Sequence, residues 1–171
     1  MGKSQLDRRR FLGSALAVSA TAGCSKKAAS LSLSETEMAT LTSICDQMIP
    51  PDQDPGGAWA GVPTYISRQL RGPFRQDLPA YRNGLAEADR RADGSFPSLS
   101  RQKQLDVLNQ MDRDKATKGF ISMVAAHSMQ GYYGSPRHGG NRDYCSWRML
   151  GVPASPVRGR DPYDFTKGGR T

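Results

Sequence analysis

The residues of this 171-residue chain whose types suit chemistry are few, and they begin with its two histidines. Neither His127 nor His138 has a companion ligand at the spacing that a metal site needs. His127 lies on an apolar helical stretch, which favours a hydrogen-bonded core or interface residue over a base or a metal ligand. His138 follows Arg137 in a glycine-rich stretch, where we expect its ring to cap backbone groups. Asp143 could orient His138 as in a hydrolase dyad, but no serine in a nucleophile-elbow context accompanies them, so catalysis by these residues is the weaker hypothesis.

The cysteines offer a second kind of chemistry. In an oxidising compartment Cys45 and Cys145 could form a disulfide. The alternative is that Cys45 is a buried thiol on an apolar helix face, and the sequence cannot decide, because a bridge requires Cα atoms ~4.4–6.8 Å apart. Two cysteines are too few to hold an iron–sulfur cluster. The glycine-rich segments lack the strand, turn and helix of a phosphate cradle, and no dinucleotide fingerprint is present. We therefore expect no cofactor site in this chain.

The most unusual composition lies in residues 131–153, GYYGSPRHGGNRDYCSWRMLGVP, which mix turn formers with large aromatic side chains. We expect no simple helix there. Large side chains with a polar handle, held on such a segment, suit an ordered binding loop or an interface. The interface candidates are Tyr132, Tyr133, Arg142, Asp143, Trp147 and Arg148.

Within this segment, residues 139–143 (GGNRD) predict an ordered, tightly hydrogen-bonded loop rather than a ligand site. We call this loop the knot; the chain is not topologically knotted there. Paired glycines permit a tight reversal, and we expect Gly140 to need a positive φ. Asn141 and Asp143 can each bond nearby backbone amides. The guanidinium of Arg142 suits a two-pronged bond to a carboxylate, either within the domain or on a partner. The alternative is a flexible, solvated loop.

Helical patterns must position these residues, and no stretch alternates with period two for long enough to predict a strand. Ser34 and Glu37 form a capping box, and the apolar spacing that follows stops at Pro50. We therefore predict an all-α domain of about five helices. Two of the other four predicted helices cover residues 63–71 and 78–92. A fourth helix is capped by Ser98 or Ser100 and buries Leu105, Leu108 and Met111. A fifth covers residues 117–132 and presents Phe120, Met123, Val124 and His127.

The first thirty residues predict an export signal of the twin-arginine kind. A basic stretch is followed by an apolar run that is shorter than the ~20 residues of a membrane span. Such signals serve cargo that crosses the membrane folded, usually because it or a bound partner holds a cofactor, so we expect the periplasm as the destination. The residues of the signal are Arg8, Arg9, Arg10, Phe11 and Leu12.

The signal ends near Cys24, whose small preceding residues also suit lipoprotein cleavage. Because Thr21 stands where leucine is usual, lipidation of Cys24 and ordinary cleavage nearby both stay open. We divide the chain into a signal peptide and tether at 1–30, a helical domain at 31–153, and an extended or disordered tail at 154–171. We expect this tail to drape over a partner or to remain disordered.

The basic charge does not predict a nucleic-acid-binding protein. Residues 1–23 hold four basic residues and one aspartate, so their removal lowers the formal net charge from +8 to +5. The remaining lysines and arginines are dispersed among acidic residues and form no stripe with interleaved aromatics. From Leu31 onward the chain has roughly 140 residues, which suit one small domain. The hydrophobic fraction of 37% and the mean hydropathy of −0.61 predict a modest core.

Several motifs together resemble one known family. The chain resembles the small third, or gamma, subunit of gluconate 2-dehydrogenase and of related periplasmic flavin-dependent sugar and sugar-acid dehydrogenases. The motifs that carry the resemblance are residues 41–50 (LTSICDQMIP), 61–70 (GVPTYISRQL), 131–136 (GYYGSP), 139–143 (GGNRD) and 147–153 (WRMLGVP).

The resemblance implies a role in a complex. In that family a large subunit binds FAD and oxidises the substrate, a multihaem cytochrome c subunit takes the electrons, and the small subunit carries no redox group. The chain would then be non-catalytic, help the large subunit fold, accompany it through the twin-arginine export machinery and stay bound, with membrane association through the complex or a lipidated Cys24. The alternatives are a small stand-alone exported enzyme and a lipoprotein-type anchor.

Overall fold

The computed structural model describes residues 32–152, 163–164 and 169–170. Its helices confirm the all-α prediction, and the only strands in this part of the chain are two residues each, paired antiparallel within the tail. The signal and tether at 1–30, Cys24 and most of the tail at 154–171 lie outside the described residues. The elements are α1 Glu35–Met48, α2 Val62–Leu70, η1 Arg75–Asp77, α3 Leu78–Arg91, η2 Phe96–Ser98, α4 Arg101–Arg113, α5 Lys118–Tyr133, η3 Pro136–His138, η4 Arg142–Tyr144, α6 Cys145–Met149, β1 Tyr163–Asp164 and β2 Gly169–Arg170.

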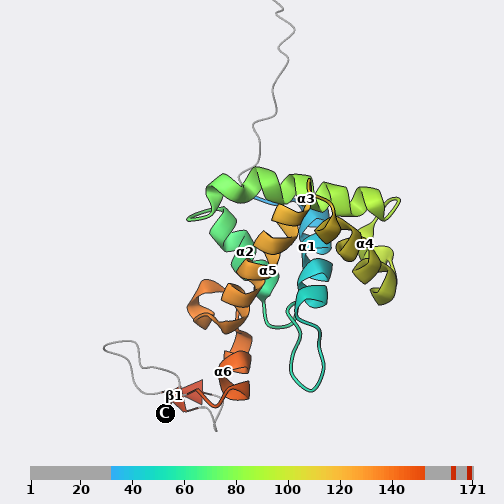
Figure 1. Ribbon diagram of the computed structural model, residues 1–171. Helices are drawn as coiled ribbons and strands as arrows, with labels where there is room; N and C mark the ends of the chain where they lie inside the picture. Colours follow the sequence, from blue (N-terminus) through green and yellow to red (C-terminus); the bar gives the residue numbers. More distant parts are fainter. Residues whose placement is uncertain (1–31, 153–162, 165–168, 171) are drawn as a thin grey trace, which may run out of the picture.

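Helix α5 lies at the centre of the bundle and packs against α1, α2, α3 and α4 (Figure 1). Its buried residues recur at spacings of three and four, so they form one broad face toward the other helices. Helix α3 crosses one end of the molecule, and the short α6 lies at the opposite end, next to the end of α5 (Figure 1). None of the described helices combines the length and apolarity needed to cross a bilayer.

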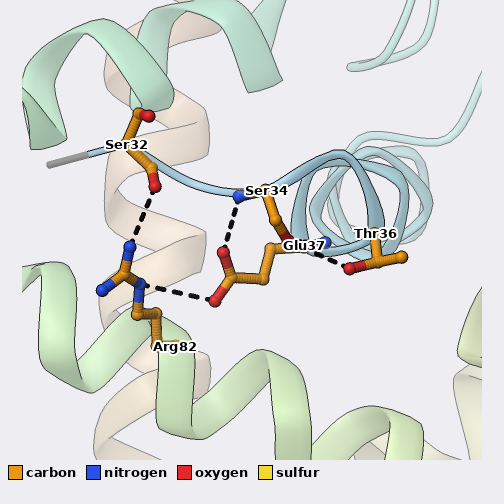
Figure 2. Close-up of a pocket in the computed structure, with 5 residues that line it drawn as sticks. All are labelled: Ser32, Ser34, Thr36, Glu37 and Arg82. Carbon is orange, nitrogen blue, oxygen red and sulfur yellow. Dashed lines mark hydrogen bonds and ion pairs between the residues drawn. The ribbon is translucent and has the colours of Figure 1, made fainter. Parts of the chain in front are cut away.

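The start of α1 is fixed by the capping box that the sequence predicts. The Ser34 amide donates to the Glu37 carboxylate at 2.7 Å, and the Glu37 amide donates to the Ser34 hydroxyl at 3.2 Å. The same carboxylate pairs with the Arg82 guanidinium of α3 at 3.4 Å, and Arg82 also donates to the Ser32 carbonyl at 2.9 Å (Figure 2). The residues that form these bonds line a shallow hollow of about 300 Å³. The bonds tie the first described residues of the chain to α3.

The buried side of α4 differs from the prediction. Ser100 caps the helix, and Leu108 and Met111 are buried as expected, but Leu105 is 40% exposed. Gln104 is buried instead, where its amide donates to the Phe96 carbonyl at 3.2 Å and accepts from the Gln47 amide at 2.9 Å. Because the polar atoms of Gln104 are satisfied there, burial carries little penalty, and the next residue is turned toward solvent.

Candidate functional site

His127 is a core residue, as the sequence predicts. Its ring is 9% exposed and stacks on Phe74 with 4.3 Å between centroids, while Tyr81 lies on the same buried network with its hydroxyl 2.9 Å from His127 Nδ1. Burial lowers the pKa of the imidazole and so favours its neutral form. Hydrogen bonding and stacking account for this side chain without a substrate.

His138 and Asp143 do not form a dyad. The Arg137 guanidinium donates to His138 Nε2 at 3.0 Å on an exposed turn, so the prediction that this ring caps backbone groups is wrong. Asp143 is exposed, and within residues 32–152 no hydrogen bond or ion pair joins its carboxylate to either histidine or to a backbone amide. The prediction that Asp143 bonds nearby amides is therefore wrong. In that same stretch no three histidine, cysteine or acidic residues are grouped as a metal site would need.

Cys45 and Cys145 are both free thiols, so the disulfide left open by the sequence is not formed. The two sulfurs face different partners. Cys45 Sγ accepts from the Ser128 hydroxyl at 3.9 Å, and Cys145 Sγ donates to Asn141 Oδ1 at 3.7 Å. Burial raises the pKa of the Cys45 thiol to about 12 and also raises that of Cys145. Both groups are thus protonated packing residues rather than nucleophiles.

The predicted knot is present and is organised around Asn141, which is fully buried. Its Nδ2 donates to the Gly134 carbonyl at 2.9 Å, and its Oδ1 accepts from the Ser146 amide at 3.0 Å. The Ser146 hydroxyl in turn donates to the Tyr132 carbonyl at 2.6 Å. Asn141 therefore ties α6 to the end of α5, and it bonds a nearby amide as predicted.

A close approach of two backbones, rather than a positive φ, explains Gly140. The left-handed conformation belongs to Gly139, with φ of 104°, so the expectation that Gly140 needs a positive φ is wrong. A Cβ built on Gly140 would stand 2.1 Å from the Gly131 carbonyl oxygen. The second glycine is needed because the knot lies directly on the last turn of α5.

The knot is also bonded to the loop that precedes α2. The Tyr132 hydroxyl donates to the Pro55 carbonyl at 2.7 Å, and the Arg142 amide donates to the Ala60 carbonyl at 3.0 Å. Tyr132 is 3% exposed, and burial raises the pKa of its phenol to about 12. Of the interface candidates, Tyr132 is therefore an internal anchor.

Strained backbone accompanies these bonds. Asn141, Asp143 and Tyr144 have φ of 45°, 52° and 57°, a conformation that costs a non-glycine residue about 1–2 kcal/mol. Such strain persists only where the surroundings fix the chain, and it is concentrated at functional segments. The knot is thus a rigid segment that holds its exposed side chains in place.

Exposed apolar side chains surround the knot. Trp59, in the loop before α2, is 44% exposed, and the Arg142 guanidinium lies 5.4 Å from its ring centroid. The Trp147 indole donates to the backbone carbonyl of Tyr133 at 2.8 Å, and Tyr133 itself is 38% exposed. We define the knot surface as the exposed side chains of Trp59, Tyr133, Arg142, Arg148, Met149, Leu150 and Val152.

The structure corrects and extends the predicted contact set. Arg142 forms no carboxylate fork with any residue from 32 to 152, so only the half of its prediction that invokes a partner stays open. Trp59 was missed by sequence reasoning, although a large aromatic beside a proline- and glycine-rich loop was the available signal. Met149 and Leu150 were missed as exposed residues, because α6 was not predicted.

Comparison with known proteins gives one finding. Residues 35–153 match the family model described as gluconate 2-dehydrogenase subunit 3. The match spans every helix of the bundle and the whole knot. Comparisons with curated proteins and with solved structures found no match.

Proposed function

The chain belongs to the gluconate 2-dehydrogenase subunit 3 family, and from that membership we propose that it is a non-catalytic accessory subunit of a periplasmic FAD-dependent dehydrogenase. It binds the large, FAD-containing subunit, supports its folding and stays in the complex. The substrate is a sugar or sugar acid and is selected by the large subunit. A cytochrome c subunit with haem c accepts the electrons, and this chain holds no cofactor.

The observation that carries the proposal is how the knot uses its polar groups. The side chains of Asn141 and Ser146 are hydrogen-bonded to the backbone of α6 and of the end of α5, and the Tyr132 hydroxyl is hydrogen-bonded to the loop before α2. These groups are therefore not available to bind a substrate. What the knot presents to solvent is aromatic, aliphatic and arginine side chains, which are typical of protein–protein contacts.

Export of the complex follows from the same proposal. The twin-arginine signal of this chain carries the folded large subunit, with FAD bound, across the membrane. The test is to replace Arg9 and Arg10 together by lysine, which keeps the charge and removes the guanidinium groups that the receptor reads. Both this chain and the large subunit should then remain in the cytoplasm, as measured by immunoblots and dehydrogenase activity of separated periplasm and cytoplasm.

The matched control replaces Arg71 and Arg113, two exposed arginines of the domain, by lysine. That variant should export the large subunit normally. Export of an active large subunit with the Arg9 and Arg10 variant would refute carriage by this chain. Failure of the large subunit to co-purify with the unaltered chain would refute the accessory role altogether.

A second test separates assembly from catalysis. Trp147→Ala removes the bond to the Tyr133 carbonyl and a ring that packs at 5.3 Å from Tyr144. Because Trp147 ties α6 to the end of α5, its loss should loosen the surface that α6 presents, so recovery of the complex should fall. Turnover per bound flavin should stay unchanged. Normal recovery with lost turnover would indicate a catalytic segment instead.

A further inference from the structure

The knot surface is apolar, positively charged and rigid, and this combination specifies the partner surface that fits it. Resting on the proposed function, we propose that the large subunit docks on the knot surface through an apolar patch that is bordered by carboxylates. Trp59, Leu150 and Val152 contact the apolar patch, and Arg142 and Arg148 pair with the carboxylates.

The exposed apolar side chains of the described residues are concentrated at this end of the molecule. Seven large hydrophobic residues are between 38% and 56% exposed, and five of them fall within residues 129–152. A sixth, Trp59, lies against Arg142 of the knot. The seventh, Leu105, is isolated on α4. Single exposed leucines are ordinary, whereas a cluster around one motif marks an interaction site.

Among the described residues, the arginines of α3 form ion pairs, whereas the arginines of the knot surface do not. All four ion pairs within residues 32–152 involve arginines of α3, and the two-fold pairing of Glu87 lowers the pKa of that carboxyl to about 2. By contrast, Arg142 and Arg148 form no ion pair with a described residue. Residues 131–152 contain three arginines against the single Asp143, so their charge is not balanced locally. A partner that supplies carboxylates provides the missing charge.

The position of Arg142 supports a carboxylate in particular. A guanidinium has its N–H groups in its own plane, so its face can contact an aromatic ring while two N–H groups bond both oxygens of a carboxylate. Two acidic residues, Asp52 and Asp54, lie in the loop beside Trp59, around a shallow hollow of about 320 Å³. In the proposed complex the partner carboxylates meet Arg142 and Arg148, and an apolar side chain meets Trp59, because Asp52 and Asp54 beside that ring would repel a carboxylate.

Rigidity adds to the fit. The backbone under Arg142 is held by Asn141, by the close approach of Gly140 to Gly131 and by the bond to the Ala60 carbonyl. A surface that is ordered before binding loses less conformational entropy when a partner docks. The strained φ values of the knot are consistent with a segment selected for its exposed geometry rather than for its own stability.

The experiment co-expresses the full affinity-tagged chain with the FAD-binding large subunit of its complex and measures how much large subunit is recovered per chain. Leu150→Asp and Arg142→Glu should each lower recovery at least tenfold. The matched controls lie on α4, where Leu105→Asp and Arg113→Glu make the same changes at exposed positions. Both controls should recover the large subunit within twofold of the unaltered chain. Far-UV circular dichroism of each variant verifies that its helices are intact.

The outcomes separate this inference from the proposed function. If Leu150→Asp and Arg142→Glu recover as much large subunit as the unaltered chain does, the docking surface is overturned and the accessory role stands. Equal losses in the α4 controls would also overturn it. No recovery by the unaltered chain would overturn both proposals. Removal of residues 154–171 should change recovery less than twofold, and a large increase would make that segment the occupant of the surface instead of the partner.

Discussion

Asn141 offers the sharpest test of how the knot is held. Asn141→Ala removes a buried side chain that joins the Gly134 carbonyl to the Ser146 amide. A buried backbone group left without its partner costs about 1–3 kcal/mol. The Ser146 amide is fully enclosed and should cost about 2 kcal/mol, whereas the partly exposed Gly134 carbonyl should cost about 1 kcal/mol, both within that range. An alanine held at the φ of 45° adds about 1 kcal/mol.

The free energy of unfolding should therefore fall by about 4 kcal/mol, a large part of the 5–15 kcal/mol of an ordinary domain. The assay is urea unfolding of the chain followed by far-UV circular dichroism. With a denaturant slope of about 2 kcal/mol per molar, the midpoint should move by about 2 M. Asn141→Gly relieves the backbone strain but not the lost bonds, so it should cost about 1 kcal/mol less.

The matched control is Asp93, which has a φ of 56° in an exposed turn. Asp93→Ala imposes the same backbone strain without breaking buried bonds, so it should cost only about 1 kcal/mol. If Asn141→Ala destabilises the chain no more than Asp93→Ala does, the hydrogen bonds of Asn141 do not hold the knot and the reasoning fails.

Three further predictions concern the core and the close contacts. Gly140→Ala should destabilise the chain by about 3 kcal/mol or more in urea titrations, because its Cβ would stand 2.1 Å from a carbonyl oxygen. The control is Gly119→Ala, whose Cβ would meet no atom within 4 Å. It should be neutral or stabilise the chain by up to about 1 kcal/mol. Burial lowers the pKa of His127, so as the pH falls below about 6.5 the unfolded chain takes up the proton first. The free energy of unfolding should therefore decline from that pH down to the pKa of the folded state. A His127→Phe variant that shows the same decline would contradict this. Thiol labelling followed by peptide mass spectrometry should leave Cys45 and Cys145 unmodified in the folded chain and label both in urea, and a peptide pair linked through the two sulfurs would contradict the free thiols.

The sequence by itself determined the local structure. Capping residues, prolines and apolar spacing act within a few residues, so Ser34 with Glu37 and the proline pair at 50–51 predicted α1. The bounds predicted for α2, α3 and α5 each lie within one residue of the observed ends. The same local composition predicted an ordered knot at 139–143, because its turn formers are adjacent in the chain. The family motifs likewise lie in short continuous segments, and all of these segments fall within residues 35–153, which match the family.

Only the tertiary structure decided which residues meet across the chain. Gly140 lies against Gly131, and Arg142 lies over Trp59, a residue more than eighty positions earlier, so no local pattern indicates either contact. Leu105 is exposed because Gln104 finds two partners on other elements, and the two free thiols lie beside different partners, Ser128 for Cys45 and Asn141 for Cys145. Each of these outcomes depends on groups that the fold brings together from distant positions, and periodicity along one helix carries no information about them.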